Sequence, residues 1–243
     1  MNAMEPISHP FPDLRSGSPR HWNLWLQWVG ANALGEMIGL GIAAMIGVGV
    51  ASTMDGRNTV FAVGLTGVAM ILAGTIEGVV VGIAQSMVLC RYLRELRGKA
   101  WVTATAIGAF VAWVLGMIPS TVMNLREPHD SQPAPEMSGA LMHGLAALMG
   151  IVLGVILALP QWRVLRRHVT RAGWWLAANS LAWAIGMPVI FLGIGAMHDL
   201  GMSFGGVIIG MLVTTVLAGA VVGAIHGLAL VWLVRQPDAG RAG

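Results

Sequence analysis

The chain has very little charge. Asp, Glu, Lys and Arg make up 10% of its 243 residues, whereas 56% of the residues are hydrophobic. Soluble domains carry about 25% charged residues. A chain so poor in charge cannot cover a globular surface with polar groups, so it needs lipid as its solvent. The net charge of +3 is small and comes from short loops. We therefore read it as a signal of membrane topology and expect no nucleic-acid partner.

The sequence lacks the residues and motifs that several kinds of functional site require. The single cysteine, Cys90, excludes an internal disulfide and a cysteine-based zinc site. The apolar segments contain no lysine, which excludes a retinal Schiff base. Gly-x-Ser-x-Gly, His-Glu-x2-His and phosphate-loop motifs are also missing. We expect a protein that is not an enzyme and has no metal site, and the sequence identifies no cofactor.

Six apolar segments are each long enough to span roughly 30 Å of hydrocarbon as a helix. The sequence thus predicts an all-α membrane protein, with a polar N-terminal segment at 1–21, a six-helix transmembrane domain at 22–235 and a C-terminal tail at 236–243. The N-terminal segment lacks the apolar core of a signal peptide, so we expect no cleavage there. The six segments are Trp22–Val50, Thr59–Cys90, Trp101–Met123, Met137–Trp162, Trp174–Met197 and Phe204–Val234.

The basic residues predict the orientation. Twelve of the fourteen fall near the two termini and in the second and fourth connections, and only Arg57 and Arg126 fall on the other side. Positive loops stay in the cytoplasm. We therefore expect a multi-pass protein of a bacterial cytoplasmic membrane with both termini inside.

Eight of the ten tryptophans also lie near the predicted cytoplasmic helix ends, while Trp113 and Trp183 lie deeper. Indole rings prefer the headgroup level of a bilayer, so these eight predict a one-sided aromatic belt. Basic residues beside such a belt favour contact with anionic lipid headgroups, although topology alone explains them. The candidate lipid-contacting residues are Arg163, Arg166, Arg167, Trp162 and Trp174.

One pattern, Gly-x3-Gly/Ala-x2-Gln/His, occurs three times, ending at Gln85, Gln161 and His226. The odd-numbered segments match one another through Trp28-x3-Asn32 and Trp175-x3-Asn179, and the third segment through Trp113-x2-Gly116-Met117. A unit of two helices keeps its orientation when it is repeated. We expect three parallel hairpins around a pseudo-threefold axis along the membrane normal. Small residues four apart let helices approach closely in lipid, which leaves little room for a wide pore.

Two acids, Glu36 and Glu77, fall near the middle of apolar segments. An ionised acid at a helix centre costs roughly 2.5–3.5 kcal/mol, so such a group faces the bundle, is protonated or has a partner. No Lys or Arg lies at the same depth, and Asn32, one turn before Glu36, is a candidate hydrogen-bond partner. The two acids form either a proton- or cation-binding site or structural hydrogen bonds between helices.

A polar layer is expected toward the cytoplasmic side, formed by Gln85, Gln161 and His226, and Asn179 is a further candidate for binding a ligand or ion. These residues serve either as a vestibule for a ligand or ion, or as interhelical hydrogen bonds. His226 and His143 are the only histidines deep enough to ligate a haem or chlorin, and their different depths argue against one site with both.

The run Gln161-Trp162-Arg163-Val164-Leu165-Arg166-Arg167, followed by Trp174-Trp175-x3-Asn179, is similar to Gly- and Trp-rich bacterial membrane proteins with like repeats. The resemblance implies a polytopic bundle and no assigned activity. Three two-helix repeats also occur in mitochondrial carriers, but their Pro-x-Asp/Glu-x2-Lys/Arg signature is missing here.

These observations favour a binding or accessory subunit without catalytic activity, which holds a lipid, a pigment or a partner protein. Its expected partners are membrane lipid and either other membrane subunits or a hydrophobic ligand. The alternative is a small-solute or ion transporter that uses Glu36 and Glu77 for proton or cation coupling. An enzyme acting on lipid ranks third.

Overall fold

The computed structural model describes residues 19–54, 60–125 and 138–235. Every regular element in these ranges is an α-helix, and six helices are long and apolar enough to cross a membrane. The all-helical, multi-pass prediction is confirmed at this level, and the predicted segment boundaries agree to within a few residues. The helices are α1 (Pro19–Met54), α2 (Val60–Tyr92), α3 (Gly98–Leu125), α4 (Gly139–Leu165), α5 (Trp174–Asp199) and α6 (Phe204–Arg235).

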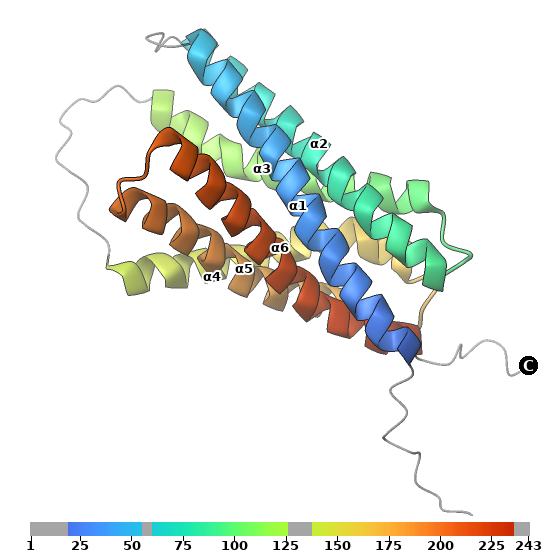
Figure 1. Ribbon diagram of the computed structural model, residues 1–243. Helices are drawn as coiled ribbons and strands as arrows, with labels where there is room; N and C mark the ends of the chain where they lie inside the picture. The colour runs from blue at the N-terminus through green and yellow to red at the C-terminus, as the bar shows by residue number, and fades with distance from the viewer. Residues whose placement is uncertain (1–18, 55–59, 126–137, 236–243) are drawn as a thin grey trace, which may run out of the picture.

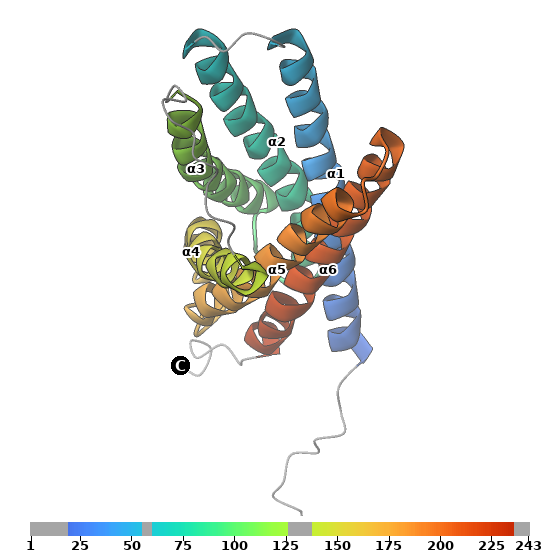
Figure 2. The same cartoon turned by 90° about the vertical axis from the view of Figure 1, so that its left-hand side faces the viewer.

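The helices form a ring in which each packs against its neighbour in the chain and α6 packs against α1. Figure 2 shows α1, α2 and α3 in one group and α4, α5 and α6 in another, meeting where α3 adjoins α4 and where α6 adjoins α1. The contact between α3 and α4 is the least extensive of the six. We call the end where α1 begins and α6 ends the termini end, and the opposite end the far end (Figure 1).

The repeated glycines lie where helices pack most closely. A Cβ added at Gly82 would lie 3.0 Å from Cα of Val102 on α3, and one at Gly154 would lie 2.6 Å from Cα of Ser180 on α5. One at Gly219 would lie 3.0 Å from Cα of Ala33 on α1. Each copy of the pattern therefore brings an even-numbered helix against the odd-numbered helix that follows it around the ring. Close backbone approach stabilises helix pairs in lipid, where water provides no driving force.

The buried core lies toward the termini end and contains Trp28, Trp101 and Trp175, each with no solvent-exposed surface. This finding corrects the predicted belt, because these three indoles face the centre of the bundle and not the headgroup region. Trp22 and Trp174, which are 56% and 62% exposed, remain on the outer surface. Position along the sequence gave the depth of each tryptophan but not the side of the helix on which it lies.

Candidate functional site

Trp28, Trp101 and Trp175 form a triangle inside the ring, here called the tryptophan triad. Their ring centroids are 5.9, 6.0 and 6.3 Å apart, and each pair meets edge to face. Aromatic rings favour this arrangement because the positive edge of one ring meets the negative face of the next. The triad comes from α1, α3 and α5 and fills the centre of the bundle at this level.

Each indole N–H of the triad donates a hydrogen bond to the polar residue that ends one copy of the glycine pattern. Trp101 donates to Oε1 of Gln85 at 3.0 Å, and Trp175 donates to Oε1 of Gln161 at 3.0 Å. Trp28 donates to Nδ1 of His226 at 2.8 Å. The third segment therefore joins this network through Trp101, three turns away from the Trp113 alignment predicted from sequence.

A second row of hydrogen bonds lies one turn farther from the termini end. The side chains of Asn32, Thr105 and Asn179 donate to the carbonyl oxygens of the triad residues four positions earlier, at 2.7, 3.0 and 2.9 Å. Gln85 Nε2 donates to Oδ1 of Asn32 at 2.8 Å, and Gln161 Nε2 donates to Oγ1 of Thr105 at 2.9 Å. These five residues and His226 are called the polar layer below.

The predicted hydrogen bond from Asn32 to Glu36 is not the one formed, since the Asn32 amide donates to the Trp28 carbonyl and accepts from Gln85. The structure brings together the three predicted members of the polar layer, Gln85, Gln161 and His226, and adds the site candidates Asn32 and Asn179 to them. Sequence reasoning missed Thr105 as a member. The signal was present, because Thr105 follows Trp101 by four residues, as Asn32 follows Trp28.

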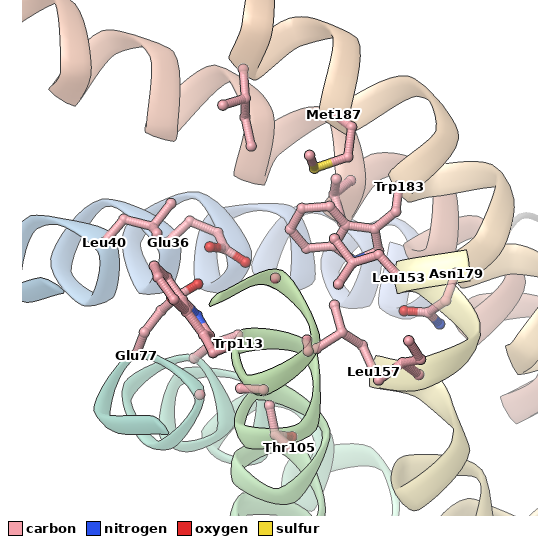
Figure 3. Close-up of a pocket in the computed structure, with 18 of the residues that line it drawn as sticks. Glu36, Leu40, Glu77, Thr105, Trp113, Leu153, Leu157, Asn179, Trp183 and Met187 are labelled. Carbon is pink, nitrogen blue, oxygen red and sulfur yellow. The ribbon is translucent and has the colours of Figure 1, made fainter. Parts of the chain in front are cut away.

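A cavity of about 500 Å³ lies within the ring, on the far side of the polar layer from the triad. The polar layer lines one end of it, and the triad seals that end because its indoles are fully buried. The remaining walls are mostly apolar, with contributions from Leu40, Leu153 and Met187 (Figure 3). Close contacts at the repeated glycines bring neighbouring helices together around the ring, yet this space remains at its centre.

Glu36 and Glu77 lie side by side in the cavity wall (Figure 3), and their carboxyl groups are close enough to form a hydrogen bond when one of them is protonated. We call them the acid pair. Trp113 Nε1 donates to Oε2 of Glu77 at 2.9 Å. Oε2 of Glu36 is buried and has no hydrogen-bond partner in the described part of the chain, although Glu36 is only 6% exposed. A hydrogen bond between two carboxyl groups needs one shared proton, so this contact leaves the pair with at most one negative charge.

Glycines of the neighbouring helices position both acids. A Cβ at Gly39 of α1 would lie 2.9 Å from Cγ of Glu77, and one at Gly219 of α6 would lie 2.9 Å from Cγ of Glu36. The two acidic stems therefore occupy space that an alanine would fill. Since α1, α2 and α6 all hold the pair in this way, its geometry is part of the helix packing.

Comparison of the chain with protein-family models, with curated proteins and with solved structures finds no significant match.

Metal ligands do not gather in the described residues, where no group of three His, Cys, Asp or Glu side chains could hold an ion. His226 Nδ1 accepts the Trp28 hydrogen bond. A ring nitrogen that accepts a hydrogen bond carries no proton, so the proton of the neutral imidazole lies on Nε2. His143 lies near the start of α4 at the far end, with Nδ1 2.6 Å from the Gly139 carbonyl oxygen. The two histidines therefore do not meet.

The candidate lipid-contacting residues gather around the loop between α4 and α5 at the termini end. Arg163, Arg166 and Arg167 are exposed, and the Arg166 guanidinium lies 5.0 Å from the ring centroid of the partly buried Trp162. Trp174 is exposed and meets Trp232 of α6 edge to face at 6.4 Å. Cations and indoles of this kind favour the headgroup region of a membrane.

Proposed function

We propose that the protein is an integral membrane binding protein, which holds a small hydrophobic ligand in the cavity of its helix ring and catalyses no reaction itself. The observation that carries the proposal is the cavity: about 500 Å³, mostly apolar, with a few polar groups converging on it. Small-molecule sites in proteins share this size range and this composition. A bundle that needed no ligand would fill such a space with side chains, because protein interiors are close-packed.

The polar layer and the acid pair have different relations to this cavity. The amides of the polar layer are largely satisfied by one another and by the triad. Glu36, beside the cavity, keeps a buried oxygen that has no partner among the residues that the structure describes. Buried polar atoms of this kind call for a partner supplied from elsewhere. A bound ligand with a hydrogen-bond donor meets that requirement.

We further propose that the helices form three parallel hairpins around a pseudo-threefold axis. The nearly equal sides of the tryptophan triad and its three equivalent hydrogen bonds support this arrangement. The basic residues at the termini end support a bacterial cytoplasmic membrane with both termini inside, and Arg163, Arg166, Arg167, Trp162 and Trp174 as headgroup contacts.

The binding function is tested by purifying the protein in mild detergent and identifying small molecules that are released on denaturation, by mass spectrometry. A Gly116→Phe variant is the comparison, since Gly116 lines the cavity and has no atom within 4 Å of an added Cβ. We expect one hydrophobic compound at near-stoichiometric amount in the parent protein and its loss in the variant. Equal small-molecule content in both proteins contradicts the proposal.

The orientation is tested with single cysteines introduced after replacing Cys90 by serine. We expect Ser138→Cys, at the far end, to react with a membrane-impermeant thiol reagent in intact cells, and Arg94→Cys, at the termini end, to react only after the membrane is opened. The reverse pattern contradicts the proposed orientation.

The acid pair supports a second candidate, a transporter that couples solute movement to protons. A hydrogen-bonded pair of carboxyl groups in an apolar wall can hold or release a proton, as intramembrane acids do in proton relays. Proteoliposomes with an imposed proton gradient test this candidate. Proton-driven flux that disappears in both Glu36→Gln and Glu77→Gln supports it, and flux unchanged in both variants rules out coupling through these acids.

A further inference from the structure

Among the described residues that line the cavity, the exposed ones all belong to α3 and α4, whereas the lining residues of α1, α2, α5 and α6 are buried or partly buried. These exposed residues are Leu115, Gly116, Met149 and Val152. Since α3 and α4 also make the least extensive contact in the ring, the cavity reaches the lipid-facing surface between them.

Carboxyl groups and aromatic rings both line this cavity. Oε2 of Glu36 is buried without a partner, and no Lys or Arg is among the described residues that line the cavity. Trp113 lies beside the acid pair, while Trp183 lies on the opposite side (Figure 3). A carboxylate and indole faces within an apolar wall favour an organic cation, through a charge-assisted hydrogen bond and cation–π attraction.

The missing basic residues also restrict the ligand. A phosphate group brought into this cavity would find no Lys or Arg to pair with, and an unpaired buried charge is strongly unfavourable. Aminophospholipids, which carry an ammonium next to a phosphate, are therefore poor candidates. An ammonium group joined directly to an apolar body satisfies both the acid pair and the apolar walls.

Building on the proposed binding function, we propose that the ligand is a lipophilic amine that enters from the bilayer between α3 and α4. Its ammonium N–H is donated to Oε2 of Glu36, close to Trp113 and Trp183. Its apolar body lies against α3 and α4, toward the opening. The hydrogen bond gives specificity for an amine that carries an N–H, and the apolar body gives most of the contact area.

The test measures saturable binding of radiolabelled dodecylamine by equilibrium dialysis, with the full chain in nanodiscs of phosphatidylcholine and with empty nanodiscs to subtract partitioning. Dodecanol serves as the uncharged probe of the same length. We expect saturable amine binding that weakens roughly ten- to a hundredfold in Glu36→Gln, since a charge-assisted hydrogen bond is lost. The matched control is Asp199→Asn, which removes an exposed carboxylate at the far end.

The opening is tested by Gly116→Phe against Gly144→Phe. Both glycines are exposed and have no atom within 4 Å of an added Cβ, but only Gly116 lines the cavity. We expect the first substitution to abolish saturable binding and the second to leave it unchanged. This pair also decides the question if Glu36→Gln does not fold, as judged by thermal unfolding and gel filtration.

Three results overturn the inference: amine binding that is equally strong in Glu36→Gln, dodecanol binding as tightly as dodecylamine, or full competition by phosphatidylethanolamine added to the nanodiscs. Saturable binding of dodecanol but not of the amine contradicts the amine while the binding function stands. Binding of neither probe, together with a purified protein that releases no compound, contradicts both.

Discussion

The tryptophan triad with its polar layer and the acid pair are two polar regions at neighbouring depths of one helix ring, yet they are built in opposite ways. In the triad each indole N–H has a partner, and α1, α3 and α5 each contribute the same kind of contact. In the acid pair, α1 and α2 each contribute a carboxyl group, and one oxygen has no partner among the described residues. The first region largely satisfies its own hydrogen bonds, and the second leaves an acceptor open beside a cavity.

We interpret this difference as a division of roles: the first region stabilises the fold, and the second is the part that holds the ligand in the proposed function. A fully satisfied network in a low-dielectric interior rigidifies the packing, whereas a half-satisfied one destabilises it. Residues that bind ligands are commonly retained at some expense in stability. We therefore expect substitutions in the triad to unfold the protein and substitutions in the acid pair to change binding with little loss of stability.

The largest effect is expected for Trp101→Ala. The indole is fully buried between two other indoles, and its removal leaves a void and takes away the shorter of the two hydrogen bonds that Oε1 of Gln85 accepts. We expect a loss of about 3–5 kcal/mol in the free energy of unfolding, the range for large-to-small core substitutions. Denaturant-induced unfolding in detergent micelles measures it.

The matched control for Trp101→Ala is Trp174→Ala, which truncates a 62% exposed indole at the outer surface. We expect a much smaller loss for this variant. Equal losses in the two variants would mean that the triad does not anchor the bundle.

A smaller loss is expected for Gly154→Ala. The added Cβ would meet the backbone of Asn179 and Ser180 on α5, so the two helices must move apart. Overpacking of this kind destabilises by about 1–3 kcal/mol. Gly144→Ala, in the same helix with open space around it, is the control and should be neutral or slightly stabilising. The midpoints of thermal unfolding of both variants check this, and indistinguishable midpoints would contradict close packing at Gly154.

Glu36→Gln is expected to increase the free energy of unfolding, whereas the substitutions above decrease it. The amide can still donate to Glu77, and the buried position no longer holds a group that can become charged. We expect stability to rise by about 0.5–2 kcal/mol, the range of single stabilising substitutions. Unfolding of this variant beside Asp199→Asn measures the change. A loss as large as that of Trp101→Ala would place Glu36 with the structural residues and remove the contrast between the two regions.

The smallest effect is expected for Trp113→Phe, which removes only the indole donor to Glu77 and keeps an aromatic ring in the cavity wall. Single hydrogen bonds between membrane helices contribute about 0.6 kcal/mol. We therefore expect a stability loss near that value with dodecylamine binding weakened only modestly. Loss of all saturable binding would mean that the indole N–H holds the acid pair in its binding geometry.

Much of the helical architecture follows from local sequence. Apolar segments of sufficient length predict six helices because, in lipid, a helix satisfies its own backbone hydrogen bonds without partners. The glycine pattern predicts close packing because small residues four apart form a flat face on one helix. The same pattern identifies Gln85, Gln161 and His226, which end its three copies. The sequence did not identify which residue of α3 is equivalent to Trp175 of α5. The motif Trp113-x2-Gly116-Met117 resembles the α5 sequence, whereas Trp101 makes the equivalent contact.

The sequence by itself determined the six helices long and apolar enough to cross a membrane, the close-packing glycines and the place of each polar residue along its helix. These properties depend on hydropathy and on spacing along one helix, which are local. Only the tertiary structure decided that Trp28, Trp101 and Trp175 turn inward and that Glu36 meets Glu77 beside a cavity. Those contacts join different helices, and they depend on how each helix is rotated about its axis in the ring. That rotation results from the contacts between all neighbouring helices in the ring, which no single segment encodes.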